Sequence, residues 1–185
     1  MAFDGSSQAP PATAVFTADD IGEILRERGW LAGHARLAAN SMLRAWLTRA
    51  AELLGPQAAD CAALADLLGL VFNFDAATIL LQPASQAVLA REGSRDVIRE
   101  LANRVLDAGD IDSDRFKEII DGMKAAVPQR SRELFHPVRL SLAGRAGEGE
   151  LDRVILLLDL AAKLEFSVPV KGTRQRMLEF CAALD

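Results

Sequence analysis

Tyrosine is absent from this 185-residue chain, and aromatic residues make up only 5% of it. Alanine and leucine dominate instead, and hydrophobic residues account for 50% of the sequence. This composition favours helices over sheets, because Ala and Leu are strong helix formers whereas aromatic residues are enriched in strands. A chain of this length can bury one good core, or split it over two small lobes. The expected fold class is therefore all-α, with two small helical subdomains.

Cysteine and histidine are also scarce, with two residues of each type. Cys61 and Cys181 lie far apart and outside any CxxC motif, so we expect two buried thiols, without a disulfide framework or a metal site. We find no Ser/His/Asp spacing that supports catalysis, and we expect no cofactor. The most apolar stretch, residues 154–162, is too short to span a membrane. No secretion signal begins the chain, which indicates a cytoplasmic protein without membrane contacts.

The charge balance is acidic, with 26 Asp and Glu against 21 Lys and Arg and a net charge of −5. Such a balance argues against a protein that coats nucleic acid nonspecifically, and we expect no DNA partner. A local cationic cluster nevertheless stands in the second half: Arg130, Arg132, Arg139, Arg145 and Arg153. Because Glu133, Glu148, Glu150 and Asp152 interleave with it, the cluster is either a solvated face of mixed charge or a binding surface.

Helical periodicity and capping signals recur from Thr17 onward. Thr17 and Asp20 form a capping-box pattern, and Gly29 is a helix stop. Apolar residues at steps of three and four predict a helix over 34–54, and residues 71–75 are expected to form an extended or turning connection. A further helix is predicted to open at Pro83, and Ser94 and Ser113 are predicted to cap the next two helices.

The predicted elements divide the chain into three parts. Residues 1–16 are small, polar and proline-bearing, so we expect a disordered lead-in. Residues 17–75 would form the first helical subdomain and residues 76–185 the second. The Met1 start favours a complete small protein over a fragment of a larger one.

One glycine-rich stretch has the appearance of a nucleotide loop. In "ELFHPVRLSLAGRAGEGEL", residues 133–151, an alternating run leads into G-x-x-G-x-G. A dinucleotide fold needs G-x-G-x-x-G, and a P-loop ends in Lys-Ser or Lys-Thr. Here Glu148, Glu150 and Asp152 stand where a phosphate would bind, and carboxylates compete for that position at a helix N-terminus. We therefore expect no binding of ATP or NAD.

The same stretch is expected to be helical over residues 138–142 despite its strand-like alternation. Pro137 would occupy the first helical turn, and Gly144 would end the helix in a left-handed conformation. Glu148 would then lie at the start of the next helix, with Leu151 turned toward the packed side or the loop rim.

With its surroundings, this stretch resembles the anticodon-binding region of bacterial glutamyl-tRNA synthetases. "ELFHPVRLSLAG…GEL…VILLLD" is similar to the family's L-F-x-P-[LI]-R-x-A-L-T-G segment, Gly-Pro-x-Leu turn and I-x-x-L-L-G run. "LLGPQAADCAALADLLGLVFNFD" is similar to its L-x-R-P-R helix end and the segment that follows. The resemblance covers roughly residues 18–159 and implies an all-α module that binds tRNA. The H-x-G-H and K-M-S-K-S motifs of the family's catalytic domain are absent, so we expect no enzyme activity.

The resemblance assigns roles to individual residues. Arg139 matches an arginine that contacts the anticodon, a task that suits a guanidinium because it pairs with base edges and phosphates. Leu151 matches an apolar residue of the following turn, where Glu148 replaces a small hydroxyl residue. Gln57 replaces an arginine that reads the last anticodon base, and would relax the choice between tRNA-Glu and tRNA-Gln. Together with Arg145 of the cationic cluster, these residues form the predicted RNA-binding set.

Departures from the family pattern support a second hypothesis. Ala143 replaces a threonine, Gly149 a proline, and Gly55 and Gln57 replace two arginines. Each lost base contact weakens RNA binding by about 1–3 kcal/mol. The alternative is a helical protein–protein interaction module with a decayed RNA site, which docks on a synthetase or another partner.

Overall fold

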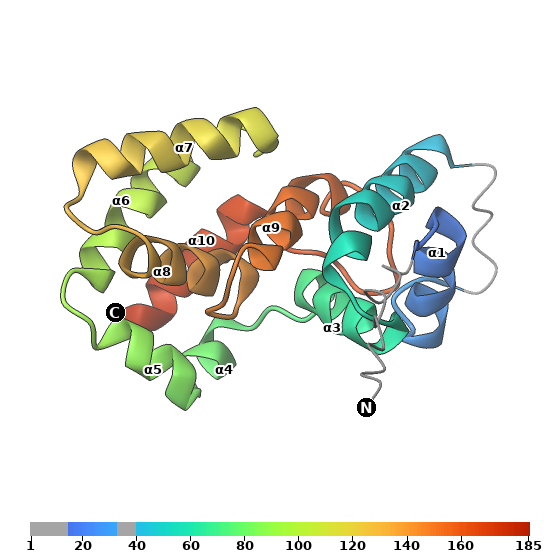
Figure 1. Ribbon diagram of the computed structural model, residues 1–185, viewed down its shortest axis with the longest axis horizontal. Coiled ribbons are helices and arrows are strands. Elements are labelled where there is room, and N and C mark those ends of the chain that lie inside the picture. Colours follow the sequence, from blue (N-terminus) through green and yellow to red (C-terminus); the bar gives the residue numbers. More distant parts are fainter. Residues whose placement is uncertain (1–14, 33–39) are drawn as a thin grey trace, which may run out of the picture.

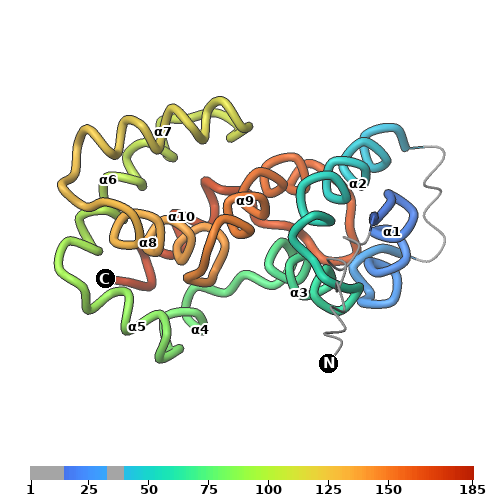
Figure 2. The backbone as a smooth tube through the Cα atoms, in the orientation of Figure 1, coloured from blue at the N-terminus to red at the C-terminus, as the bar shows by residue number. Residues whose placement is uncertain are grey.

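The structure, a computed structural model, describes residues 15–32 and 40–185 (Figures 1 and 2). Within these ranges it contains ten α-helices, one 3-10 turn and no strand, which confirms the all-α prediction. None of the described helices is long and apolar enough to cross a membrane. The predicted lead-in, apart from Val15 and Phe16, and the histidine at position 34 lie outside the described residues.

The first half comprises α1 (Ala18–Glu27), α2 (Ser41–Leu54), the 3-10 turn η1 (Gly55–Gln57) and α3 (Cys61–Phe72). The predicted capping box of α1 is confirmed, since Thr17 N–H donates to Asp20 at 2.6 Å and Asp20 N–H donates to Thr17 Oγ1 at 3.3 Å. The described part of the second helix begins after Asn40, whose side chain caps it. Cys61 is exposed at the first position of α3, so its predicted burial is wrong.

The second half comprises α4 (Ala76–Leu81), α5 (Pro83–Leu89), α6 (Ser94–Asp107), α7 (Ser113–Ala126), α8 (Arg132–Ala143), α9 (Glu150–Ala161) and α10 (Thr173–Leu184). Pro83 opens α5 as predicted. The predicted caps of α6 and α7 are each displaced by one residue, because Gly93 at φ +76° precedes α6 and Asp112 caps α7. Such shifts are expected, since capping signals locate a helix end only to within a residue or two.

The stretch with the strand-like alternation belongs to helix α8. Residues 138–142 are helical, and Gly144 ends the helix at φ +81°, both as predicted. A side chain at Gly144 would also meet the end of the Ile79 side chain at 2.9 Å, so a larger residue would have to displace it as well as adopt the left-handed conformation. Pro137 lies in the middle of α8 and not in its first turn, because the helix begins at Arg132. Similarly, α3 extends to Phe72, so the predicted connection over 71–75 shrinks to its last three residues.

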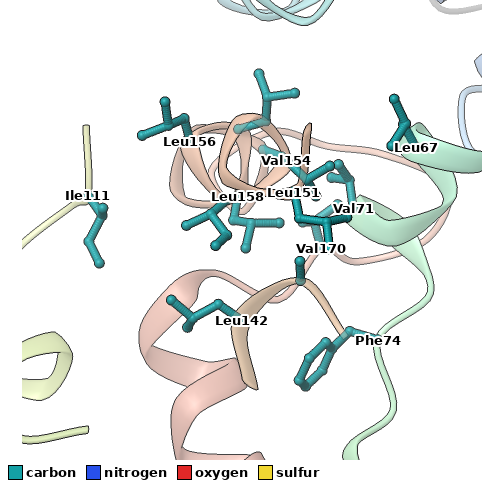
Figure 3. Packing of buried hydrophobic residues seen from close by; sticks show 14 of the residues in the cluster. Leu67, Val71, Phe74, Ile111, Leu142, Leu151, Val154, Leu156, Leu158 and Val170 are labelled. Atoms are coloured by element: carbon teal, nitrogen blue, oxygen red, sulfur yellow. The ribbon is translucent and has the colours of Figure 1, made fainter. Parts of the chain in front are cut away.

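Helix α9 is the central element of the core. It packs against α2 and α3 of the first half and against α8 of the second (Figure 1). Leu151, Val154 and Leu158 of α9 are completely buried, and Figure 3 shows them beside residues of α3 and of α8. Burial of each such side chain stabilises the fold by about 1.5–3 kcal/mol. The hydrophobic core is therefore shared by the parts of the chain before and after residue 75. The division into two subdomains at this residue stays a prediction.

A fully buried arginine of α10 joins the two halves. Arg176 donates to the carbonyls of Leu70 (3.0 Å) and Val71 (2.6 Å) near the end of α3, and to that of Leu142 (2.9 Å) near the end of α8. These carbonyls belong to the last turns of helices, where no intrahelical donor remains and the helix dipole favours a cation. Burial lowers the pKa of Arg176 to about 9, so the guanidinium remains charged at neutral pH.

Candidate functional site

The loop between α8 and α9, residues 144–149, is held in place by Arg139 of α8. The guanidinium donates from Nε and Nη2 to the two carboxylate oxygens of Asp152, both at 2.8 Å, and from Nη1 to the carbonyl of Gly147 at 2.7 Å. It also lies over the ring of Phe135 at 4.9 Å, and its side chain is only 9% exposed. All three nitrogens of Arg139 thus have partners within the chain, and this side chain shapes the loop.

The other predicted residues of this loop differ in their exposure. Arg145 and Glu148 are exposed, and Glu148 forms a solvated ion pair with Arg132 at 3.4 Å. Leu151 is fully buried, so of its two predicted positions it takes the one on the packed side. A side chain on Gly147 would meet Leu151 Cδ1 at 2.9 Å, which shows that the loop rests directly on this leucine. Leu151 and Arg139 therefore support the loop, whereas Arg145 and Glu148 face the solvent.

A pocket with a volume of about 570 Å³ lies beside the start of this loop. Its walls come from the α3–α4 connection and α4, from Gly144 and Arg145 of the loop, and from residues 168–171 before α10. Three segments that are distant in the sequence thus meet here. The volume falls in the range typical of small-ligand pockets.

Polar groups of several kinds line this pocket. Asn73 and Gln82 contribute exposed side-chain amides, which can both donate and accept hydrogen bonds. Arg145 contributes an exposed guanidinium. The ammonium of Lys171 is held by the carbonyl of Phe74 at 3.1 Å and by the carboxylate of Glu179 at 2.6 Å. The pocket therefore combines amides, cations and apolar walls in one depression.

One aromatic ring and one carboxylate complete the pocket. The ring of Phe74 lies against the guanidinium of Arg176 at 4.6 Å, so the arginine that joins the two halves also fixes this wall. Hydrogen bonds from the Thr78 side chain, and then from its backbone, lower the pKa of Asp75. Asp75 is therefore an anion at neutral pH, and it caps α4.

Gln57 lies elsewhere, in the exposed 3-10 turn at the end of α2. It does not line the pocket described above, although its neighbour Pro56 lines a smaller apolar pocket of about 340 Å³ at the start of α1. The structure therefore gathers Arg139, Arg145, Glu148 and Leu151 around one loop and places Gln57 on a different part of the surface.

Comparison with known protein families gives one match. The anticodon binding domain family matches residues 16–161, which include α1 through α9 and all five predicted site residues. The chain belongs to this family. No curated protein and no solved structure is significantly similar to it. The matched range ends before α10, so Arg176 and Lys171 lie outside it.

Several pocket residues of this anticodon-binding domain were not predicted from the sequence. Asn73 and Phe74 belong to a stretch that was interpreted only as a connection, although an amide beside an aromatic residue is a usable signal for base recognition. No sequence pattern marks Lys171 or Arg176 as a pocket residue, because their partners are carbonyls of segments that are distant in the sequence. Among the described residues, no group of three or more His, Cys, Asp or Glu side chains could hold a metal ion.

Proposed function

We propose that this chain is a tRNA-binding module that holds the anticodon loop of tRNA-Glu or tRNA-Gln and has no aminoacylation activity of its own. The observation that carries this proposal is the pocket beside the α8–α9 loop, which combines amide, guanidinium and apolar groups in a chain of the anticodon-binding family. Single-stranded RNA loops are recognised by such groups, because their unstacked bases expose edges and faces.

Each part of the site has a role in this proposal. Asn73 and Gln82 hydrogen-bond the edge of a splayed base, and Arg145 stacks on a base or pairs with a phosphate. Arg139 acts indirectly, because its bonds to Asp152 and Gly147 fix the loop before RNA arrives. A loop ordered in advance loses less conformational entropy on binding, which increases affinity.

The choice of tRNA rests on Gln57. In the family resemblance this residue replaces an arginine that reads the last anticodon base, and a glutamine amide can either donate to or accept from a base edge. Because Gln57 is exposed and lies outside the pocket, it would contact a base other than the one that the pocket holds. We propose that the module accepts both tRNA-Glu and tRNA-Gln.

Equilibrium binding of purified tRNAs tests this function. Fluorescence anisotropy with labelled tRNA-Glu, tRNA-Gln and one unrelated tRNA, over a series of salt concentrations, should show saturable binding to the first two and weaker binding to the third. Affinity should fall as salt rises, because phosphate contacts release counterions. Absence of saturable binding at low salt, or equal affinity for all three tRNAs, would contradict the proposal.

A second function is favoured by the apolar pocket near η1. Val15, Phe16 and Pro56 line it, and Val15 is 91% exposed. This surface fits a protein partner better than RNA, because none of the described residues that line it carries a positive charge, and the proposed alternative is docking on a synthetase. Co-elution with purified glutamyl-tRNA synthetase that survives ribonuclease and is lost in Val15→Asp would favour it. Co-elution that ribonuclease abolishes would favour RNA binding.

A further inference from the structure

A second cationic group lies near the start of α8, outside the residues that line the pocket. Arg91, in the connection between α5 and α6, places Nη1 3.1 Å from Nδ1 of His136 in α8. Arg132, at the start of α8, is exposed, and among the described residues its one ion pair is with the solvated carboxylate of Glu148. Within the described part of the chain, no carboxylate lies within ion-pair distance of Arg91.

The contact between Arg91 and His136 sets the protonation of the imidazole. Because Arg91 donates to Nδ1, the neutral ring carries its proton on Nε2, which is buried and has no partner among the described residues. Burial lowers the pKa of His136, and the charge of Arg91 lowers it further. Arg132 and Arg139 of α8 act in the same direction, while Glu148 of the loop raises the pKa. The group thus holds two cations and a neutral imidazole that an anion would help to protonate.

We propose that Arg91, Arg132 and His136 bind a backbone phosphate of the RNA whose base occupies the pocket. This inference rests on the proposed function. A phosphate oxygen enters between Arg91 and His136, the imidazole takes up a proton at Nδ1 and donates to that oxygen, and Arg132 exchanges Glu148 for the phosphate. Charge-assisted bonds of this kind are the strong contacts of RNA-binding surfaces.

The α8–α9 loop connects the pocket with the cationic group of Arg91, Arg132 and His136. Arg145 lines the pocket and Glu148 reaches the cationic group, and the two residues are three positions apart. The backbone between Arg145 and Glu148 spans at most about 11 Å, and their side chains lead from the loop to the pocket and to Arg132. One RNA strand with a base in the pocket can therefore bring a phosphate, a few nucleotides along, to Arg91 and Arg132.

Proton uptake gives the proposal a specific signature. The pKa of His136 in the free protein lies below the usual value of 6.5, and a bound phosphate raises it. RNA affinity should therefore increase as the pH falls from about 8 to about 6, because the complex binds a proton that the free protein does not. In His136→Gln this dependence on pH should disappear.

Matched variants separate this site from a general effect of charge. Arg91→Gln and Arg132→Gln each remove one exposed positive charge near the loop. Arg115→Gln removes one from α7, where Arg115 forms a comparable exposed ion pair with Glu118 at 2.8 Å. With an anticodon stem-loop RNA, we expect the first two variants to bind roughly fivefold to tenfold more weakly, and the logarithmic salt slope to fall by about 0.7 for each. Arg115→Gln should change affinity by less than about twofold.

Nuclear magnetic resonance of the imidazoles reports on the site directly. The chain has two histidines, so the spectrum of His34→Asn assigns the signals of His136. Addition of the RNA should raise the pKa of His136. If RNA binds saturably but the pKa is unmoved and Arg91→Gln binds like Arg115→Gln, the phosphate site is wrong and the proposed function stands. If no RNA binds, both are overturned.

Discussion

The α8–α9 loop depends on one buried arginine, Arg139, and the junction where α10 meets the ends of α3 and α8 depends on another, Arg176. The two arginines have different partners. Arg139 pairs with a carboxylate, Asp152, thirteen residues further along the chain. Arg176 instead donates to carbonyls of α3 and α8, more than thirty residues away in sequence in each case. The first arginine stabilises one loop, whereas the second joins both halves of the molecule.

Arg139 therefore orders the site, whereas Arg176 stabilises the whole fold. Loss of Arg139 would free one loop and leave one partly exposed carboxylate without its partner, because Asp152 is 24% exposed. Loss of Arg176 would leave several carbonyls buried without a donor, and it would remove the cation that lies against Phe74. Exposed arginines such as Arg145 are then the ones available to RNA.

The largest expected effect is on stability at the junction. Arg176→Met should lower the free energy of unfolding by roughly 3–5 kcal/mol, because each orphaned buried carbonyl costs about 1–3 kcal/mol and methionine fills only part of the space. Urea denaturation measures this change. The control is Arg174→Met on the same helix, an exposed residue that should cost no more than about 0.5 kcal/mol. Equal costs for the two variants would contradict the role given to Arg176.

A smaller effect is expected at the loop. Arg139→Met should destabilise the protein by about 1–3 kcal/mol, and the double variant with Asp152→Leu should recover part of this loss, since a carboxylate is no longer left unpaired. RNA affinity should fall while the salt slope stays unchanged, because Arg139 acts through the loop. A fall of about 0.7 in the slope would show instead that Arg139 contacts a phosphate directly.

Removal of the loop carboxylate should strengthen binding. Glu148→Gln abolishes the competition with RNA for Arg132, and we expect affinity to rise by roughly twofold to threefold at low salt. Glu23→Gln, an exposed carboxylate on α1, is the matched control for net charge. Anisotropy with the anticodon stem-loop measures both variants, and an equal gain in both would mean that only the overall charge matters.

The smallest expected effect is a dependence of stability on pH. The pKa of His136 is lowered in the folded protein, so the unfolded chain binds the proton more readily. Stability is then complete above about pH 6.5 and decreases as the pH falls through that value toward the lower folded pKa. Because His136 is only partly buried, the loss should not exceed about 0.5 kcal/mol relative to His136→Gln. Urea denaturation at two pH values checks the sign, and greater stability of the wild type at the lower pH would contradict it.

Local patterns were sufficient to predict most of the fold. The left-handed Gly144 follows from a signal at the residue itself, and the helical state of residues 138–142 was predicted against their alternation from the Pro137 and Gly144 that flank them. Pro137 was placed incorrectly because proline is most often found in a first turn, whereas packing of α8 tolerates it inside the helix. Packing outweighed local preference at that position.

The site was only partly predictable. Four of the five expected residues meet at one loop because they are near one another in sequence, and Gln57 does not, because α2 ends elsewhere. The pocket depends on segments around residues 73, 145 and 170, which are brought together by packing around α9 and by Arg176. No single window of sequence contains that information. Whether Arg139 meets a carboxylate or an RNA base was likewise not fixed by its motif.

The central claim is that bases of tRNA bind in the pocket beside the α8–α9 loop. The most direct test is the affinity of the wild type and of Asn73→Ala/Gln82→Ala for the tRNA-Glu anticodon stem-loop, measured by anisotropy at low salt. We predict saturable binding by the wild type and a loss of about tenfold or more in the double variant, with the melting temperature unchanged because both side chains are exposed. Equal affinities of the two proteins, or no saturable binding by either, would contradict the claim.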